Sequence, residues 1–259
     1  MSDGAASRAP TRLILLPGLG ADARLFGPQR EAFGDQLLTP EWPSMDDSPE
    51  PWSVAEIGRC LAEQLARDGS LDGAAFVLGG ISFGGQVALE AARVLAAEGR
   101  MVSAVVLIAS CRSHRAIPGS FKVFQKLGRY VPGPIARFLI GGPLASIFIA
   151  SHRLTGENAD AIRSMARGLD RPRLLRFARA CARWTFDPDA FTRDTGVPIM
   201  QIHGENDRVI PLRPGDPDRV IERGPHLIHM THSDEVNGYL RSVLVVRQAD
   251  AEPQVTADS

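Results

Sequence analysis

The feature that most constrains this chain is a Gly-rich segment built around one serine, Gly80-Ile81-Ser82-Phe83-Gly84-Gly85. The apolar run 75–78 precedes this segment, and the Ala-rich stretch 86–97 follows it. A strand, a tight turn and a helix in this order form the setting in which a GxSxG sequence presents its serine at the edge of a sheet. We therefore predict that Ser82 is a nucleophile, and the structural alternative is an incidental serine in a Gly-rich turn.

Short apolar runs alternate with amphipathic stretches along most of the chain. We expect strands at residues 12–16, 36–39, 75–78, 104–108, 197–203 and 219–222. A helix is expected after Ser53, where Glu56 has the spacing of a capping box, and a closing helix is expected from Ser233 to Leu244. This alternation predicts an α/β fold with a mostly parallel sheet flanked by helices.

The alternation stops between Arg112 and Phe186, where helical periodicity continues without a strand signal. We interpret residues 112–186 as a helical cap inserted into a core of residues 11–111 and 187–247. The polar termini, residues 1–10 and 248–259, are expected to be flexible. The cap holds 14 Arg and Lys against three acids, whereas the whole chain has a net charge of −1. Two interpretations of this excess of positive charge are open: the cations form solvated helix faces, or they attract an anionic substrate or partner.

A serine nucleophile needs a general base, and the position of His226 suits this role. His226 lies between the last expected strand and the closing helix, at the same edge of the sheet as Ser82. The nearby His229 and His232 could instead pack beneath that helix, and His203 is expected to be a structural hydrogen-bonding residue. We predict that His226 is the base.

The base needs an acid that fixes its tautomer, and the loop after strand 197–203 offers two. Asp207 is the predicted partner, with Glu205 as its rival. The developing oxyanion also needs donors. We expect these to be the backbone N–H groups of Phe83 and of Leu19 in the loop 17–20. A phosphate-binding turn at that loop is disfavoured, because neither GxGxxG nor a Walker lysine is present.

These residues together resemble the α/β-hydrolase superfamily, whose chain order of nucleophile, acid and base is that of Ser82, Asp207 and His226. The segments PGLGADARLF, GISFGG, IHGENDRVIP and GPHLIHMTHSDEVNGYL carry the resemblance, which covers about residues 11–110 and 195–245. The resemblance implies that the cap roofs the active site and sets substrate choice.

The chain departs from the superfamily pattern in three places. Pro17 replaces the usual histidine before the oxyanion loop. Little chain precedes Arg12, so we expect the first antiparallel strands to be missing. Only residues 212–218 separate the acid loop from the last strand, which leaves no room for the usual helix. The sheet edge near Gly215 is therefore expected to be open and could support a homodimer.

A serine nucleophile disfavours the superfamily branches that use aspartate or cysteine, and leaves esters, thioesters, lactones and some carbon–carbon bonds as substrates. We expect a serine hydrolase that cleaves the carboxylic ester of a small or medium acyl substrate through an acyl-enzyme on Ser82. The alternatives are a thioesterase acting on an anionic carrier such as acyl-CoA, and a ligand receptor on a retained hydrolase scaffold. The apolar window 138–150 would line an acyl pocket or form the buried core of the cap.

The remaining expectations, on cofactors, disulfides, binding partners and location, follow from composition. No cofactor motif or metal cluster is apparent, and three widely spaced cysteines indicate buried thiols rather than disulfides. The near-neutral charge gives no general attraction to nucleic acid or to a membrane. The window 138–150 is interrupted by Gly141, Gly142 and Pro143, so we expect no stable membrane insertion. No targeting segment is apparent, and a cytoplasmic location is expected.

Overall fold

One parallel sheet organises the molecule. The computed structural model describes residues 12–46, 48, 51–71, 75–117, 119, 130–213 and 217–250. Six strands follow the order β2-β1-β3-β4-β5-β6, and every neighbouring pair is parallel. They are β1 (Arg12–Leu16), β2 (Leu37–Leu38), β3 (Phe76–Ile81), β4 (Val102–Ile108), β5 (Ile199–Gly204) and β6 (Arg219–Ile221). The predicted α/β fold is confirmed, and residues 1–11, which precede β1, lie outside the described residues.

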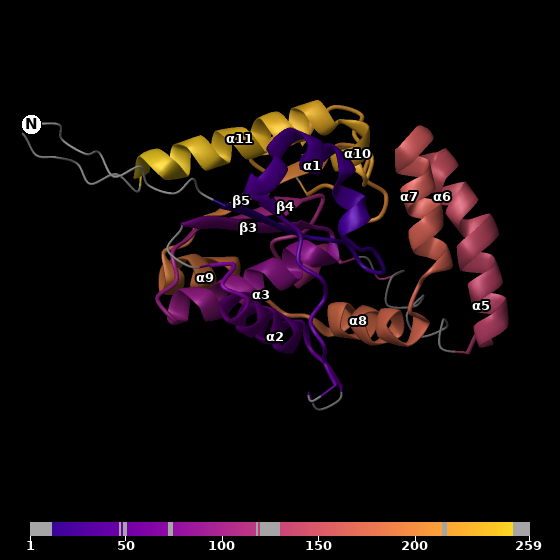
Figure 1. The fold of residues 1–259 in the computed structure, drawn as a ribbon, viewed down its shortest axis with the longest axis horizontal. Coiled ribbons are helices and arrows are strands. Elements are labelled where there is room, and N and C mark those ends of the chain that lie inside the picture. Colours follow the sequence, from indigo (N-terminus) through magenta and orange to yellow (C-terminus); the bar gives the residue numbers. More distant parts are fainter. Residues whose placement is uncertain are drawn as a thin grey trace, which may run out of the picture.

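Helices cover both faces of the sheet (Figure 1). One face carries α1 (Gly27–Phe33), α10 (Ile228–Thr231) and α11 (Ser233–Asp250), and the other carries α2 (Val54–Arg67), α3 (Phe83–Ala97) and α9 (Pro188–Thr195). Alternate side chains of each strand enter opposite cores. In β1, for example, Leu13 and Leu15 belong to one core, and Ile14 and Leu16 belong to the other.

Local signals set the helix boundaries. Ser53 caps α2 by accepting a hydrogen bond of 3.1 Å from the backbone N–H of Glu56, which confirms the predicted cap. The closing helix α11 begins at Ser233 as expected and continues to Asp250, past the predicted end at Leu244 and into the first residues of the tail that was expected to be flexible. The rest of that tail, and residues 1–10, lie outside the described residues.

The described residues between β4 and β5 form helices joined by turns and loops, and none of them forms a strand. Short turns η1 (Ala23–Phe26) and η2 (Gly34–Gln36) belong to the core, and η3 (His114–Ala116) begins the insertion. The insertion then forms α5 (Gly133–Leu139), the π-helical turn η4 (Ile140–Leu144), α6 (Ala145–Ser151), α7 (Gly156–Arg167) and α8 (Arg171–Arg183). These helices lie beyond the carboxyl ends of the strands, at the right in Figure 1.

The structure corrects two expectations about the apolar window 138–150. Gly141, Gly142 and Pro143 do not interrupt it, because a wider π-helical turn accommodates the proline and joins α5 to α6. The resulting helix Gly133–Ser151 has 19 residues, and by length and composition alone it could cross a membrane. An 18-residue stretch of this helix has a mean hydropathy of 1.5. Only 12% of it is buried, so most of the window forms neither an enclosed acyl pocket nor the core of the cap.

The remaining structural expectations concern the cysteines and the sheet edge. Cys60, Cys111 and Cys181 are buried thiols. Strand β6 lies at the end of the sheet, where it pairs with β5. Gly215, near which an open edge was expected, lies outside the described residues.

Candidate active site

Ser82 occupies a strained turn between β3 and α3. Its φ of 53° and ψ of −122° lie in a region that residues with a Cβ rarely adopt. The backbone on both sides is fixed, because Ser82 N–H donates to the Ile108 carbonyl at 3.0 Å and Ser110 Oγ donates to the Ser82 carbonyl at 2.5 Å. Strain of this kind persists only where the surroundings hold it, and it is concentrated at functional sites.

The glycines around Ser82 are required by the close approach of the backbone. A Cβ at Gly80 would lie 2.5 Å from the carbonyl carbon of Gly84. At Gly84 it would overlap the carbonyl oxygens of Leu16 and Pro17. At Gly85 it would lie 2.5 Å from Ser110 Oγ. A side chain at any of these positions would therefore force the neighbouring backbone or the Ser110 side chain to shift.

The candidate oxyanion donors lie on segments that border Ser82. A Cβ at Gly18 would lie 3.7 Å from the Cβ of Ser82, which places the loop 17–20 beside the serine. Leu19 is the next residue of that loop. Phe83 is the first residue of α3, so its N–H has no carbonyl partner within the helix. The positive end of the α3 dipole is directed toward the same place.

The structure brings Asp207 and His226 together. Asp207 follows β5, His226 follows β6, and Ser82 follows β3, so all three lie at the carboxyl edge of the parallel sheet. His226 Nδ1 and Asp207 Oδ2 are 2.7 Å apart, and both side chains are buried. The rival Glu205 is exposed and accepts from the backbone N–H of Arg223 at 2.8 Å. Glu205 therefore caps a turn, and Asp207 orients the imidazole.

The carboxylate of Asp207 accepts hydrogen bonds on both oxygens. Its Oδ1 accepts from the backbone N–H groups of Val209 at 2.8 Å and Ile210 at 2.9 Å. Its Oδ2 lies 3.2 Å from Nε2 of His203 in addition to the contact with His226. Burial by itself would raise the pKa of Asp207, but the hydrogen bonds from His203, His226 and Ile210 outweigh burial and hold this pKa well below its usual value.

His203 has the structural role that the sequence predicted, and the structure shows what it supports. Its Nε2 lies 2.8 Å from the Ile210 carbonyl oxygen, and Gln201 Nε2 lies 3.4 Å from its Nδ1. This arrangement fits a tautomer in which Nδ1 accepts from Gln201 and Nε2–H donates to the Ile210 carbonyl and the Asp207 carboxylate. The buried side chains of Gln201 and His203 therefore hold the Asp207 carboxylate in place.

Two further histidines lie near His226. His229 is fully buried at 5.8 Å from the ring of Phe26, and burial, aided by the charge of His226, lowers its pKa to about 3. His152, in the turn after α6, feels the charges of His226 and Asp207, and burial is the main cause of its lowered pKa. No sequence pattern indicated that His152 lies near the site, because this proximity depends on how the cap folds over the core.

An aromatic cluster joins the cap to the turn at Ser82. The ring centroids of Trp42, Phe83 and Phe177 are 5.3–5.6 Å apart. Trp42 also donates through Nε1 to the Ala21 carbonyl at 3.2 Å. Phe177 lies on α8, so this helix is anchored beside the residue that follows Ser82. The sequence did not indicate this cluster, because its members lie far apart along the chain.

Helices α7 and α8 lie over the loop that carries Leu19. A Cβ at Gly20 would lie 3.1 Å from Leu174 and 2.9 Å from Leu169, which places two apolar cap residues against this loop. Arg24 Nη1 donates to Ser164 Oγ at 2.5 Å and ties α7 to η1. The position of the cap over the carboxyl edge of the sheet follows from these contacts.

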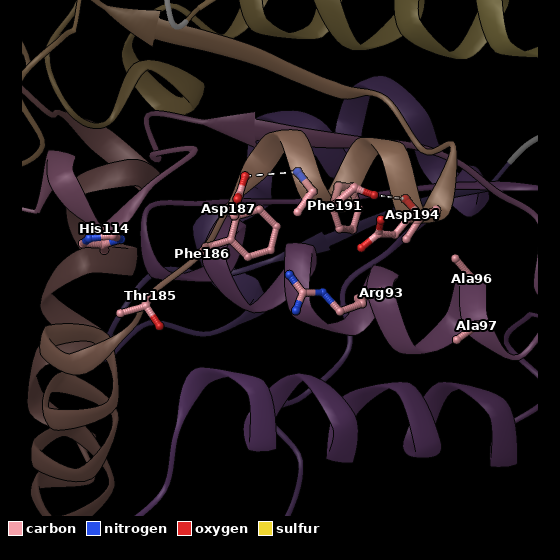
Figure 2. A pocket seen from close by; sticks show the side chains of 11 residues that line it. Arg93, Ala96, Ala97, His114, Thr185, Phe186, Asp187, Phe191 and Asp194 are labelled. Atoms are coloured by element: carbon pink, nitrogen blue, oxygen red, sulfur yellow. Dashed lines mark hydrogen bonds between the residues drawn. The ribbon is translucent and has the colours of Figure 1, made fainter.

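Figure 2 shows a separate pocket of about 580 Å³ between α3 and α9. Arg93 on α3 and Asp187 and Asp194 around α9 contribute to its lining. None of Ser82, Asp207 and His226 lines this pocket. Arg93 lies about three helical turns beyond Ser82 along α3. Within the described part of the chain, no group of three or more His, Cys, Asp or Glu side chains is arranged to hold a metal ion.

Known structures share this architecture at low sequence identity. An esterase from Thermogutta terrifontis is 20% identical, with a TM-score of 0.68, and the match covers 92% of this chain and 91% of that chain. The esterase RhEst1 from Rhodococcus sp. ECU1013 is 20% identical over 92% and 91% of the two chains, with a TM-score of 0.66. A bromoperoxidase from Bacillus anthracis is 17% identical over 92% of each chain, with a TM-score of 0.67.

Sequence comparison gives the family. No curated protein matches the chain. Residues 13–238, which include Ser82, Asp207 and His226, match the model of a family described as the alpha/beta hydrolase family. The protein is therefore a member of the alpha/beta hydrolase family.

Proposed function

We propose that this protein is a serine hydrolase that cleaves the carboxylic ester of a small or medium acyl substrate. One observation carries the proposal: a serine held at a φ of 53° lies at the same sheet edge as a buried His226–Asp207 pair 2.7 Å apart. A strained, glycine-enclosed serine at the same sheet edge as an oriented imidazole is the combination that nucleophilic catalysis needs.

The proposed mechanism assigns one task to each group. His226 Nε2 accepts the proton of Ser82 Oγ as this oxygen attacks the ester carbonyl carbon. Asp207 keeps the proton of the neutral imidazole on Nδ1 and stabilises the imidazolium that forms. The backbone N–H groups of Leu19 and Phe83 donate to the oxyanion of the tetrahedral intermediate. The intermediate collapses to an acyl-enzyme, and the alcohol leaves with the proton from His226.

The second half of the reaction reverses these proton transfers. A water molecule gives a proton to His226 Nε2 and attacks the acyl carbon, and the bond to Ser82 Oγ then breaks as Oγ takes the proton back. The ionised state of Asp207 suits both halves, because its lowered pKa keeps the carboxylate charged at neutral pH.

The surroundings favour an apolar acyl group. Leu169 and Leu174 lie against the loop that carries Leu19, and the ring of Phe83 packs against Trp42 and Phe177. Apolar side chains gathered around a few directed polar groups are typical of sites that bind small acyl ligands.

Labelling with a fluorophosphonate probe tests the proposal directly. We expect wild-type protein to react at Ser82, as mapped by peptide mass spectrometry, and Ser82→Ala to be unlabelled and unable to hydrolyse a chromogenic ester. Ester hydrolysis by Ser82→Ala at the wild-type rate would contradict the proposal. Absence of labelling in folded wild-type protein would contradict it as well, and would favour a ligand receptor on the hydrolase scaffold.

The charge of the cap favours one second candidate, a thioesterase acting on an anionic carrier such as acyl-CoA. The insertion 112–186 contains 14 Arg and Lys against three acids, and Arg153, Arg167 and Arg176 are among the exposed cations. For this candidate, added salt should raise the KM for the anionic thioester and leave the KM for a neutral ester nearly unchanged. Equal responses of the two KM values would reject the candidate.

A further inference from the structure

We propose that the outer side of the helix Gly133–Ser151 docks on an anionic phospholipid surface. We call this side the outer cap face. It consists of the exposed apolar residues of α5, η4 and α6, which are Ile135, Phe138, Leu139, Leu144 and Ile147. Phe138 is 71% exposed and Ile147 is 65% exposed, values far from those of the apolar residues that form the two cores. A contiguous apolar surface of this kind marks an interaction site.

The helix geometry gathers these residues on one side. Ile135 and Phe138 are three residues apart, as are Leu144 and Ile147, and Leu139 and Leu144 are five apart across the π-helical turn. These spacings keep successive side chains on one side of the helix. The opposite side is already occupied, because Ala145 and Ile149 are buried in the molecule. The helix is thus apolar on both sides, and packing within the molecule accounts for only one of them.

The basic residues around this helix indicate that its partner is anionic. Residues 111–156, which contain this helix, include seven Arg and Lys and no Asp or Glu. Arg153 lies two residues after the end of α6 and is exposed, and Arg167 is exposed at the end of the neighbouring α7. Apolar side chains that enter the acyl boundary, with basic side chains nearby for the headgroups, describe a helix that lies in an anionic lipid interface. A second copy of this chain is a poorer partner, because two such faces would bring like charges together.

The packing of the helix indicates that it lies along the surface rather than across it. Its buried side, with Ala145 and Ile149, remains attached to the cap, and a spanning helix would have to give up these contacts. His152, at the end of α6, feels the charges of His226 and Asp207. Docking through the outer cap face would place the lipid against the same helix whose end is followed by His152. The inference concerns where the protein binds, and it does not depend on the reaction at Ser82.

Vesicle co-sedimentation tests the inference with the full-length protein. The probes are vesicles of phosphatidylcholine alone and vesicles of phosphatidylcholine mixed with phosphatidylglycerol. We expect wild-type protein to sediment with the mixed vesicles and much less with the neutral ones. Ile147→Glu and Phe138→Glu should each weaken this binding by about tenfold or more, because each removes an apolar contact and adds a charge that the anionic surface repels.

Two controls separate the inference from folding and from catalysis. Val245 is 64% exposed, nearly the same as Ile147, and belongs to α11, whose C-terminal end lies away from α5, α6 and α7 (Figure 1). Val245→Glu should bind the mixed vesicles as wild type does. Ser82→Ala should also bind them normally, so an inactive protein that still binds would leave this inference standing while contradicting the proposed function.

Three results would overturn the inference. The first is equal binding of wild type to neutral and mixed vesicles, which would remove the role of charge. The second is unchanged binding by folded Ile147→Glu, with folding checked by circular dichroism. The third is wild-type protein that ignores vesicles and forms a dimer that Ile147→Glu dissociates in analytical ultracentrifugation, which would assign the outer cap face to a second copy.

Discussion

The turn at Ser82 and the helix Gly133–Ser151 are both rich in glycine, but the glycines have different meanings. In the turn, a Cβ at Gly80 or Gly84 would collide with backbone atoms. In the helix, Gly133 and Gly142 have no atom within 4 Å of the place a Cβ would take. Close packing therefore requires glycine in the turn. In the helix, no neighbouring atom of the described residues requires glycine at Gly133 or Gly142.

The largest expected effect is a loss of ester hydrolysis when the carboxylate that contacts His226 is replaced. Asp207→Asn should lower kcat for ester hydrolysis by roughly 10⁴-fold, because an amide at this place favours the wrong tautomer of His226. The matched control is Glu205→Gln, two residues away, where the exposed carboxylate only caps the backbone of Arg223. Steady-state kinetics on a chromogenic ester would measure both variants. A similar loss in the two variants would contradict the assignment of the acid.

The next effect concerns the glycines of the turn. Gly84→Ala should lower the free energy of unfolding by about 3 kcal/mol, because the added methyl group meets the carbonyl oxygens of Leu16 and Pro17. Activity should fall with it, since the same backbone shift would displace Ser82. Urea unfolding monitored by circular dichroism gives the first quantity. A Gly84→Ala protein with wild-type stability would show that the turn is looser than its contacts indicate.

A third effect compares a core histidine with a cap histidine. The pKa of His229 is lowered to about 3 by burial, so between pH 6.5 and 3 the unfolded chain binds a proton that the folded chain does not. This contribution to stability is fully present above pH 6.5 and is lost as the pH falls. His229→Gln should therefore reduce the pH dependence of the free energy of unfolding in this window, by up to about 1.4 kcal/mol per pH unit.

The half-exposed His152 provides the comparison for His229. Its pKa is also lowered, but burial there is partial, so His152→Gln should alter the same pH dependence less. Urea titrations of the three proteins at several pH values would measure both effects. A larger change for His152→Gln than for His229→Gln would contradict the assignment of His229 as the more deeply buried histidine.

The smallest expected effect lies in the outer helix. Gly142→Ala should leave stability unchanged or raise it by up to about 1 kcal/mol, because alanine favours helix and no neighbour opposes the methyl group. Thermal unfolding would detect the change. A marked loss of stability would show that Gly142 is needed for the π-helical turn, and would make the two glycine-rich segments more alike than their contacts suggest.

The sequence could predict the features that depend on residues close together in the chain or on the order of the strands. Ser53 as a helix cap and the strand before Ser82 were predictable, because each depends on neighbours in the sequence. The candidate base and acid were predictable from their positions after parallel strands, which bring distant loops to one edge. The sequence favoured Asp207 over Glu205 as the acid, and the structure shows that the Asp207 carboxylate is the one that contacts His226.

Other features depend on contacts that no local pattern encodes. The cluster of Trp42, Phe83 and Phe177 joins three separate parts of the chain. The continuity of the helix through Pro143 was missed because a proline usually ends a helix, and the wider turn that tolerates it leaves no sequence signal. Apolar composition did not predict burial at Phe138 either, because hydropathy measures what a side chain prefers and not what the fold provides.

The backbone at position 82 is held by groups that belong to other residues. The Ile108 carbonyl and the Ser110 hydroxyl fix the peptide groups on either side, and the space for the turn comes from the glycines. Nothing in these contacts involves the hydroxyl of Ser82 itself. The contacts that shape the turn are therefore independent of the hydroxyl at position 82, so a substitution such as Ser82→Cys would change the group presented at the sheet edge and leave these contacts in place.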